Sequence, residues 1–211
     1  MHITIIANGI IQDYAATAKK LAQTDYIIAC DGGLRHAMAM GRVPHCLIGD
    51  LDSAPTAQIT YCREQGVQII PYPPAKDETD LELALAHAVA KNPAAITILG
   101  ALGGRFDHAL GNVHVLAQAQ DIATELWDEH TSIVLINRRV ALPQDGYHTL
   151  SLIPLTTSVT GITTQGLAYP LCNETLHAGQ ARGISNTFTS DTATISVVSG
   201  QLLAIRNQSS H

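Results

Sequence analysis

The sequence predicts an α/β protein with a mainly parallel, Rossmann-like N-terminal α/β domain and a smaller C-terminal antiparallel β-sandwich domain. Up to about residue 130, short apolar runs alternate with helix-like segments. This alternation implies crossover connections and a buried parallel sheet. After that point, short β-branched runs are separated by Gly, Pro, Asn and Asp, a pattern typical of a small sandwich. We therefore expect two domains, residues 1–130 and 131–211.

The elements follow from the hydrophobic pattern taken in order. Thr79 marks the clearest helix start, because Thr79 and Glu82 form a capping box ahead of apolar residues at helical spacing. This helix is expected to end before Asn92-Pro93. The remaining helices are expected at 13–23, 34–40 and 107–120. Strands are expected at 3–7, 26–29, 46–48, 67–70 and 96–99, and then at 133–136, 147–153, 161–164 and 193–198.

The composition excludes several classes of protein. The chain has 211 residues, 46% of them hydrophobic, and a formal net charge of −6. Without a basic patch, we expect no nucleic-acid partner. No apolar stretch approaches the roughly 18–20 residues of a membrane span, and the N-terminus resembles a strand rather than a signal peptide. The four cysteines are scattered, which favours a reducing cytoplasm over a disulfide framework or a zinc site.

Charged residues make up only 14% of the chain, so aspartates at element ends stand out. Asp50 and Asp52 follow the strand expected at 46–48, beside Gly49. Two aspartates two positions apart at a strand end can hold Mg²⁺, and ligands of open α/β sheets bind beyond the carboxyl ends of strands. A solvated turn is the alternative, because Asp, Gly and Ser are common turn residues.

A second acidic motif surrounds the helix start at Thr79. Asp77 and Asp80 could hold a metal, with Lys76 meeting a phosphate beside it. Acidic residues are also favoured in the first turn of any helix because of the helix dipole. Taken alone, this motif favours the capping role.

A glycine-rich loop opens the helix expected at 107–120. Gly103 and Gly104 permit close approach of an anion to a helix N-terminus, and Arg105 can grip a phosphate with two hydrogen bonds. Asp107 could cap the helix or reach a metal. His108 could act in catalysis or be a structural histidine. The spacing matches neither the dinucleotide fingerprint nor a Walker loop.

Three further motifs fit either turns or ligand contacts. At Asp31-Gly32-Gly33, the glycines could expose backbone amides to a nucleotide, or the motif could be a plain turn. In the β-rich half, Tyr169 could stack on a flat heteroaromatic ligand. Ser185 and Asn186 have the composition of a hairpin corner.

Taken together in this order, the motifs resemble those of the thiamine pyrophosphokinase family. The resemblance runs from residue 31 to residue 188. It implies transfer of the terminal pyrophosphoryl group of ATP to the hydroxyl of thiamine, with release of AMP. It also implies a homodimer with thiamine bound near the subunit interface.

The resemblance also implies roles for individual residues. Asp50, Asp52, Asp77 and Asp80 are the implied Mg²⁺–phosphate carboxylates. The sequence does not choose the group that takes the proton of the alcohol, which could be one of the aspartates, such as Asp80, or His108. The implied catalytic set is Asp52, Asp77, Asp80, Arg105 and His108. The implied nucleotide and phosphate contacts are Asp31, Gly32, Gly33, Lys76, Gly103, Gly104, Arg105 and Asp107. Tyr169, Ser185 and Asn186 are the implied thiamine contacts.

Two other functions fit parts of the same pattern. A Mg²⁺-dependent nucleotide pyrophosphohydrolase would use the aspartates and the glycine-rich loop, but would leave the β-rich half unexplained. A non-catalytic thiamine or nucleotide sensor would bind both ligands without turnover. Thiamine-dependent formation of AMP from ATP distinguishes the transferase from both.

Overall fold

The computed structural model describes residues 1–119 and 122–208, and the chain divides into two compact units, Met1–Glu129 and His130–His211. The expected helix end at Gln120 and the last three residues of the expected second domain lie outside the described residues. The mixed α/β class is confirmed. The narrower descriptions, Rossmann-like and β-sandwich, stay predictions.

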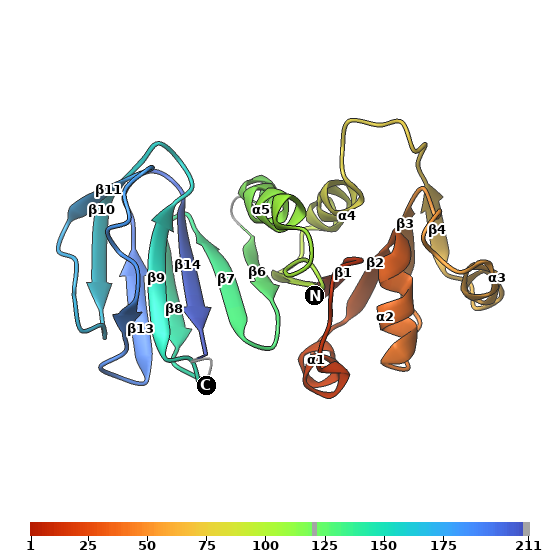
Figure 1. The fold of residues 1–211 in the computed structure, drawn as a ribbon, viewed down its shortest axis with the longest axis horizontal. Coiled ribbons are helices and arrows are strands. Elements are labelled where there is room, and N and C mark those ends of the chain that lie inside the picture. Colours follow the sequence, from red (N-terminus) through yellow and green to blue (C-terminus); the bar gives the residue numbers. More distant parts are fainter. Residues whose placement is uncertain (120–121, 209–211) are drawn as a thin grey trace. The chain divides into compact units, whose positions relative to one another are not determined.

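The described N-terminal unit is built on a parallel sheet with strand order β6-β5-β1-β2-β3-β4. Helices α4 and α5 lie on one face of this sheet, and α1 and α2 on the other (Figure 1). The strands are β1 (His2–Ile6), β2 (Tyr26–Cys30), β3 (Cys46–Gly49), β4 (Gln68–Pro71), β5 (Ala95–Leu99) and β6 (Ala123–Trp127). The helices are α1 (Tyr14–Leu21), α2 (Leu34–Ala39), α3 (Thr56–Glu64), α4 (Asp80–Val89) and α5 (Phe106–Val115), with 3₁₀ turns η1 (Asp31–Gly33) and η2 (Leu116–Ala119).

Burial explains why the central strands were readable from the sequence. In β1, β2 and β5 every residue after the first is buried, as expected for a parallel sheet covered on both faces. The capping box at the start of α4 is confirmed, with Glu82 N donating to Thr79 Oγ1 at 3.2 Å and Thr79 N donating to Glu82 Oε2 at 3.4 Å.

Six helices and strands were not predicted: α3, β6 and, in the C-terminal unit, β8 (Arg139–Pro143), β11 (Glu174–His177), β12 (Asn186–Thr187) and β14 (Leu202–Asn207). Helix α3 buries only Ile59 and Cys62, so its apolar periodicity is weak. Strand β6 alternates exposed or half-buried residues with buried ones and contains Thr and Glu. For α3 and β6, tertiary packing outweighs a weak local pattern.

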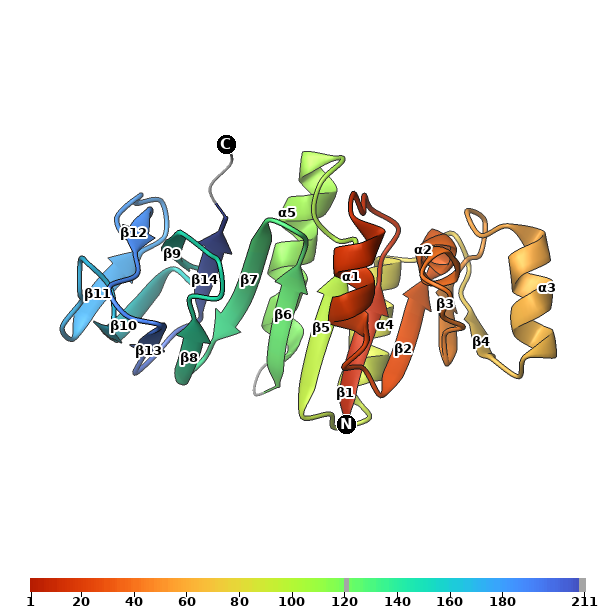
Figure 2. The same ribbon diagram turned by 90° about the horizontal axis from the view of Figure 1, so that it is seen from below.

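The described C-terminal unit contains two antiparallel sets of strands, β12-β9-β14-β7 and β11-β10-β13-β8. Figure 2 shows β7, β14 and β9 side by side. Apolar side chains from both sets, such as Leu152 and Ile195, share one core. The strands are β7 (Thr131–Ile136), β8 (Arg139–Pro143), β9 (Thr149–Pro154), β10 (Ser158–Gln165), β11 (Glu174–His177), β12 (Asn186–Thr187), β13 (Thr192–Ser196) and β14 (Leu202–Asn207).

No helix within residues 1–119 and 122–208 has the length and apolar character that a membrane crossing requires.

Candidate functional site

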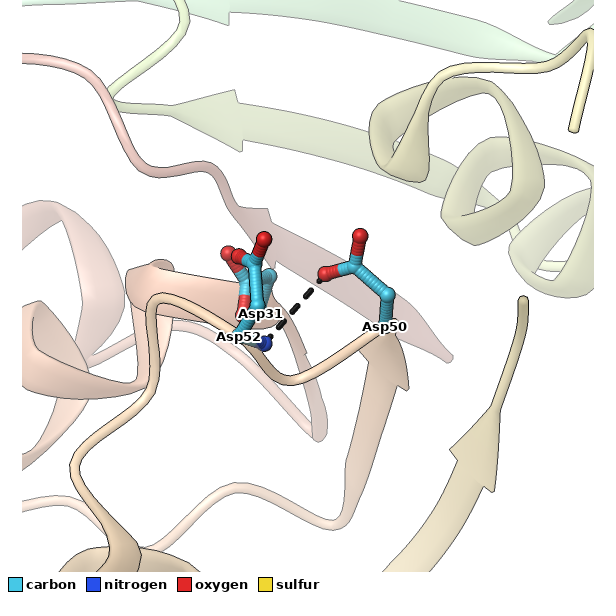
Figure 3. A group of neighbouring side chains, drawn as sticks. All are labelled: Asp31, Asp50 and Asp52. Carbon is cyan, nitrogen blue, oxygen red and sulfur yellow. Dashed lines mark hydrogen bonds between the residues drawn. The ribbon is translucent and has the colours of Figure 1, made fainter. Parts of the chain in front are cut away.

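An acidic cluster lies at the carboxyl edge of the N-terminal sheet. Asp31 follows β2 directly, and Asp50 and Asp52 follow β3. One carboxylate oxygen from each lies within 4.8 Å of the others, and the three side chains converge (Figure 3). They meet because β2 and β3 are neighbouring parallel strands, whose carboxyl ends share one edge of the sheet.

The local backbone fixes the cluster in place. Leu51 has a φ of 65°, a left-handed conformation that is rare for a residue other than glycine. This bend lets Asp52 N donate to Asp50 Oδ1 at 3.3 Å, while Ser53 N donates to Asp31 Oδ1 at 3.2 Å. Such strain persists where surrounding contacts over-determine it, and it is commonly found at functional sites.

Asp80 borders the same cluster from the start of α4. A Cβ atom placed on Gly49 would lie 3.2 Å from Asp80 Oδ2 and 3.0 Å from Asp31 Cβ. Gly49, with a φ of 144°, therefore keeps open the space between the two aspartates. The structure thus places Asp80, one of the predicted metal ligands, beside Asp31, Asp50 and Asp52.

Lys76 forms an ion pair with Asp80, with Nζ 3.0 Å from Oδ1. Oδ1 is otherwise buried and accepts no well-aligned hydrogen bond from the described residues, so the contact is mainly one of charge. Burial raises the pKa of Asp80, Lys76 opposes this rise, and Asp50 and Asp31 add to it. Burial acts to lower the pKa of Lys76, but Asp80 outweighs it and the net direction is upward.

Asp77 is not brought into this cluster. It is exposed in the loop before α4 and lies outside the group of converging carboxylates. Its predicted role as a metal ligand stays a prediction.

The clustered donors fit a hard divalent cation. Mg²⁺ prefers oxygen ligands and is usually bound through one or two carboxylates together with substrate phosphates. Asp31, Asp50 and Asp52 supply carboxylate oxygens at one point, and Asp80 adds a buried oxygen next to them. Asp31, predicted only as a nucleotide contact, therefore joins the potential metal ligands.

A cleft of about 820 Å³ opens beside the cluster. It is lined by residues that follow β1, β2 and β5 and by the first turns of α4 and α5, including Asn8, Asp31, Arg35, Asp80, Gly103 and His108. Asp31 and Asp80 border both the cluster and the cleft. A ligand in the cleft therefore reaches the carboxylates directly.

The glycine-rich loop forms one wall of this cleft. Gly103 and Gly104 have φ values of 79° and 70°, a left-handed conformation that favours glycine. Arg105 and Asp107 are both largely exposed and form an ion pair at 2.6 Å. This pairing lowers the pKa of Asp107 to about 2. His108 also lines the cleft, so the structure brings the loop motif and the acidic motifs to one site.

Gly32 and Gly33 have a packing role in the structure. Both are buried, and neither lines the cleft. A Cβ on Gly32 would lie 2.4 Å from Asn8 Oδ1, and one on Gly33 would lie 2.1 Å from the Ile6 carbonyl oxygen. Close packing accounts for glycine at both positions, and the predicted contact of their amides with a nucleotide stays a prediction.

The three predicted thiamine contacts lie together in the C-terminal unit. Tyr169 is 74% exposed, and Ser185 is exposed with a φ of 58°. Asn186, in contrast, is 7% exposed, and its side chain hydrogen-bonds the main chain of Tyr169 at 3.0 and 2.8 Å. The amide of Asn186 is therefore already engaged within the protein.

Sequence reasoning missed Asn8, Gly9 and Arg35, which line the cleft. A signal was present for the first two, because Asn8-Gly9 ends the apolar run 3–7 in the same way that Asp31 and Asp50 end theirs. Arg35 follows the Asp31-Gly32-Gly33 motif closely and could have been included with it.

An acidic cluster at the carboxyl edge of a parallel sheet, joined to a glycine-walled cleft, is typical of enzymes that handle nucleotide phosphates with a divalent metal. Comparison with known proteins narrows this class. Residues 17–127 match the family model of the thiamin pyrophosphokinase catalytic domain, and residues 136–202 match that of the thiamin pyrophosphokinase vitamin B1 binding domain.

Individual relatives agree with the family models. The thiamine pyrophosphokinase of Bacillus subtilis (strain 168) is 30% identical over 184 residues, covering 85% of this chain and 86% of the relative. The crystal structure of the B. subtilis enzyme has a TM-score of 0.88 at 28% identity, with both chains fully covered. That of the Geobacillus thermodenitrificans enzyme has a TM-score of 0.85 at 28% identity, covering 100% of this chain and 99% of the other.

The chain belongs to the thiamine pyrophosphokinase family.

Proposed function

We propose that the protein transfers the terminal pyrophosphoryl group of ATP to the hydroxyl of thiamine, giving thiamine diphosphate and AMP. The observation that carries this proposal is the position of Asp31 and Asp80, which border both the acidic cluster and the cleft. A triphosphate in the cleft would thus meet the carboxylates that hold its metal. The N-terminal unit, which matches the catalytic-domain model, would bind ATP, and the C-terminal unit, which matches the vitamin B1 binding model, would bind thiamine.

The proposed roles of the residues follow from their places. Asp31, Asp50 and Asp52 hold Mg²⁺, with Asp80 beside them; Asp77 is the further predicted ligand. Mg²⁺ bound there would neutralise charge on the phosphates. Lys76, Arg105 and the glycines of the loop, Gly103 and Gly104, would hold phosphate oxygens.

In the proposed reaction, the hydroxyl oxygen of thiamine forms a bond to the β-phosphorus of ATP. The bond from that phosphorus to the oxygen of the α-phosphate breaks, and AMP leaves. Positioning and charge neutralisation dominate such transfers. The proton of the hydroxyl passes to Asp80 or His108. Asp80 and His108 both line the cleft, so both are within the site of the proposed transfer.

In the C-terminal unit, the exposed ring of Tyr169 would stack on thiamine. Ser185 would contact thiamine directly, because its side chain is exposed. Asn186, which is buried, would act by holding Tyr169.

Two broader expectations belong to the same proposal. A homodimer with thiamine near the subunit interface is implied by the family. A cytoplasmic location is supported by the cysteines, since Cys30, Cys46, Cys62 and Cys172 are all free and structural disulfides are rare in that compartment.

The deciding experiment is to incubate the full chain with ATP and Mg²⁺, with and without thiamine, and to measure AMP and thiamine diphosphate. We expect AMP to appear only with thiamine and in equal amount to thiamine diphosphate. AMP and free pyrophosphate formed without thiamine would indicate a hydrolase. Binding of both ligands without products would indicate a sensor.

A further inference from the structure

The strand order places a crevice between β1 and β5. The chain passes from β1 outward through β2, β3 and β4 on one side, whereas β5 and β6 lie on the other. Ligands of open α/β sheets bind beyond the carboxyl ends of strands at such a switch point. The cleft lies there, lined by Asn8 and Gly9 after β1 and by Gly100 after β5.

Helix α2 fixes the segment that follows β1. Arg35 Nη2 donates to the carbonyl oxygen of Asn8 at 3.1 Å. His36, the next residue, binds the carbonyl oxygen of Gly9 through Nε2 at 2.8 Å and Tyr14 Oη through Nδ1 at 2.7 Å. Because a carbonyl only accepts, Nε2 is the donor and Tyr14 donates to Nδ1 of the neutral ring. Burial lowers the pKa of His36, in keeping with a neutral ring.

The charges of the cleft single out Arg35. The other long cationic side chains that line it are Lys76 and Arg105, and both are paired with carboxylates, Asp80 and Asp107. Within residues 1–119 and 122–208, Arg35 forms no ion pair shorter than 4.0 Å. The carbonyl of Asn8 is neutral, so it does not compensate the charge of Arg35. A guanidinium has five N–H donors. Most of these donors remain available to a ligand.

We propose that Arg35 binds a phosphate group of the nucleotide in this cleft, with its guanidinium held in position by the carbonyl of Asn8. This rests on the proposed function only in placing ATP in the cleft. A planar guanidinium suits a phosphate because it can form two parallel hydrogen bonds. An exposed side chain anchored at one nitrogen also loses less freedom on binding than an unanchored one.

The role of Arg35 can be separated from that of the loop it touches. Arg35 is exposed, whereas His36 is 4% exposed and holds the adjacent carbonyl. Gly9 N also donates to the carbonyl oxygen of Gly100 at 2.7 Å. Removing the guanidinium therefore leaves two anchors of the 8–9 segment intact.

The test uses Arg35→Gln in the full chain, with Arg63→Gln as the matched control. Arg63 is an exposed arginine in the last turn of α3 that does not line the cleft. Binding of ATP with Mg²⁺, of adenosine and of thiamine is measured by titration calorimetry, and thermal unfolding confirms folding. We expect Arg35→Gln to weaken ATP binding about 10- to 100-fold, the usual effect of losing a hydrogen bond to a charged group. Adenosine and thiamine binding should stay within about twofold of wild type.

An equal loss of affinity for adenosine and for ATP would show that Arg35 only supports the loop, and would overturn the proposal. Unchanged ATP affinity in the variant would also overturn it. So would a wild-type chain that binds no ATP. If Arg35→Gln does not fold, Arg35→Lys decides in the same assay, because it keeps the charge and loses the planar fork. If Arg35→Lys loses affinity for ATP alone, the proposal is supported, and if it loses no affinity for ATP, the proposal is overturned. Wild-type binding of ATP without thiamine-dependent AMP would contradict the proposed function while leaving this test valid.

Discussion

The side-chain amide of Asn186 brackets the main chain of Tyr169. Its Oδ1 accepts from Tyr169 N at 3.0 Å, and its Nδ2 donates to the Tyr169 carbonyl at 2.8 Å. Oδ1 also accepts from Thr187 N at 2.9 Å. A buried amide thus fixes the backbone beneath a tyrosine whose own side chain is exposed.

Asn186→Ala should destabilise the protein by about 1–3 kcal/mol, because buried backbone groups lose their partners. Tyr169→Ala is the matched comparison: its side chain is 74% exposed, so the change in stability should stay within about 0.5 kcal/mol. If Tyr169 stacks on thiamine, both variants raise the KM for thiamine. Denaturant unfolding measures the stability, and steady-state kinetics measure the KM. An Asn186→Ala protein as stable as wild type would contradict a stabilising role for the hydrogen bonds between Asn186 and the main chain of Tyr169.

Asp52→Asn should lower the affinity for Mg²⁺ and reduce turnover at least tenfold while leaving the fold intact, because it removes a carboxylate from the cluster. Asp77→Asn tests the further predicted ligand, an exposed carboxylate that lies outside the cluster. The measurement is the dependence of AMP formation on Mg²⁺ concentration. Near-normal kinetics in Asp52→Asn would contradict the metal assignment, and near-normal kinetics in Asp77→Asn would remove Asp77 from the predicted ligands.

Thr79→Ala removes the hydroxyl that caps α4. We expect a loss of about 1 kcal/mol in the free energy of unfolding, the usual effect of losing an N-cap. Thr60→Ala, at an exposed position within α3, should change stability by less than about 0.5 kcal/mol. Equal unfolding midpoints for the two variants would show that the cap contributes nothing.

Lys76→Met removes the cation that opposes the rise in the pKa of Asp80. Burial, Asp50 and Asp31 then raise that pKa without opposition. The native state keeps the Asp80 proton to a higher pH than the unfolded chain, whose ordinary value is 3.8. The stability of the variant relative to wild type should therefore fall as the pH rises above about 4, through the native pKa of Asp80. Thermal unfolding of both proteins without Mg²⁺ measures this difference, and introducing Asp80→Asn into both should remove the part of it that comes from Asp80.

Arg105→Gln should return the pKa of Asp107 from about 2 toward its ordinary value of 3.8, because the guanidinium is the main cause of the shift. An NMR titration of the Asp107 carboxyl carbon reports this directly. A midpoint that stays near 2 in the variant would show that the two side chains are not paired in solution.

Local signals were sufficient for much of the fold. The isoleucine-rich runs of β1 and β5 and the Thr79–Glu82 capping box were readable because burial on both faces and helix capping leave short-range patterns. Helix α3 was missed because its stability depends on two buried side chains. The family followed from five motifs in order, although each motif alone fits a turn or a cap.

By itself, the sequence determined the mixed α/β class, the start of α4 and the acidic and glycine-rich motifs that identify the family. Only the tertiary structure decided how these residues are grouped. Strand order brings Asp31 to Asp50 and Asp52, leaves Asp77 outside, and sets Arg35 on the cleft. The tertiary structure also buries the side chain of Asn186. Sequence spacing specifies which residues are neighbours along one helix or strand. The pairing of distant strands specifies which residues are neighbours across the sheet, and the site is built from residues of that type.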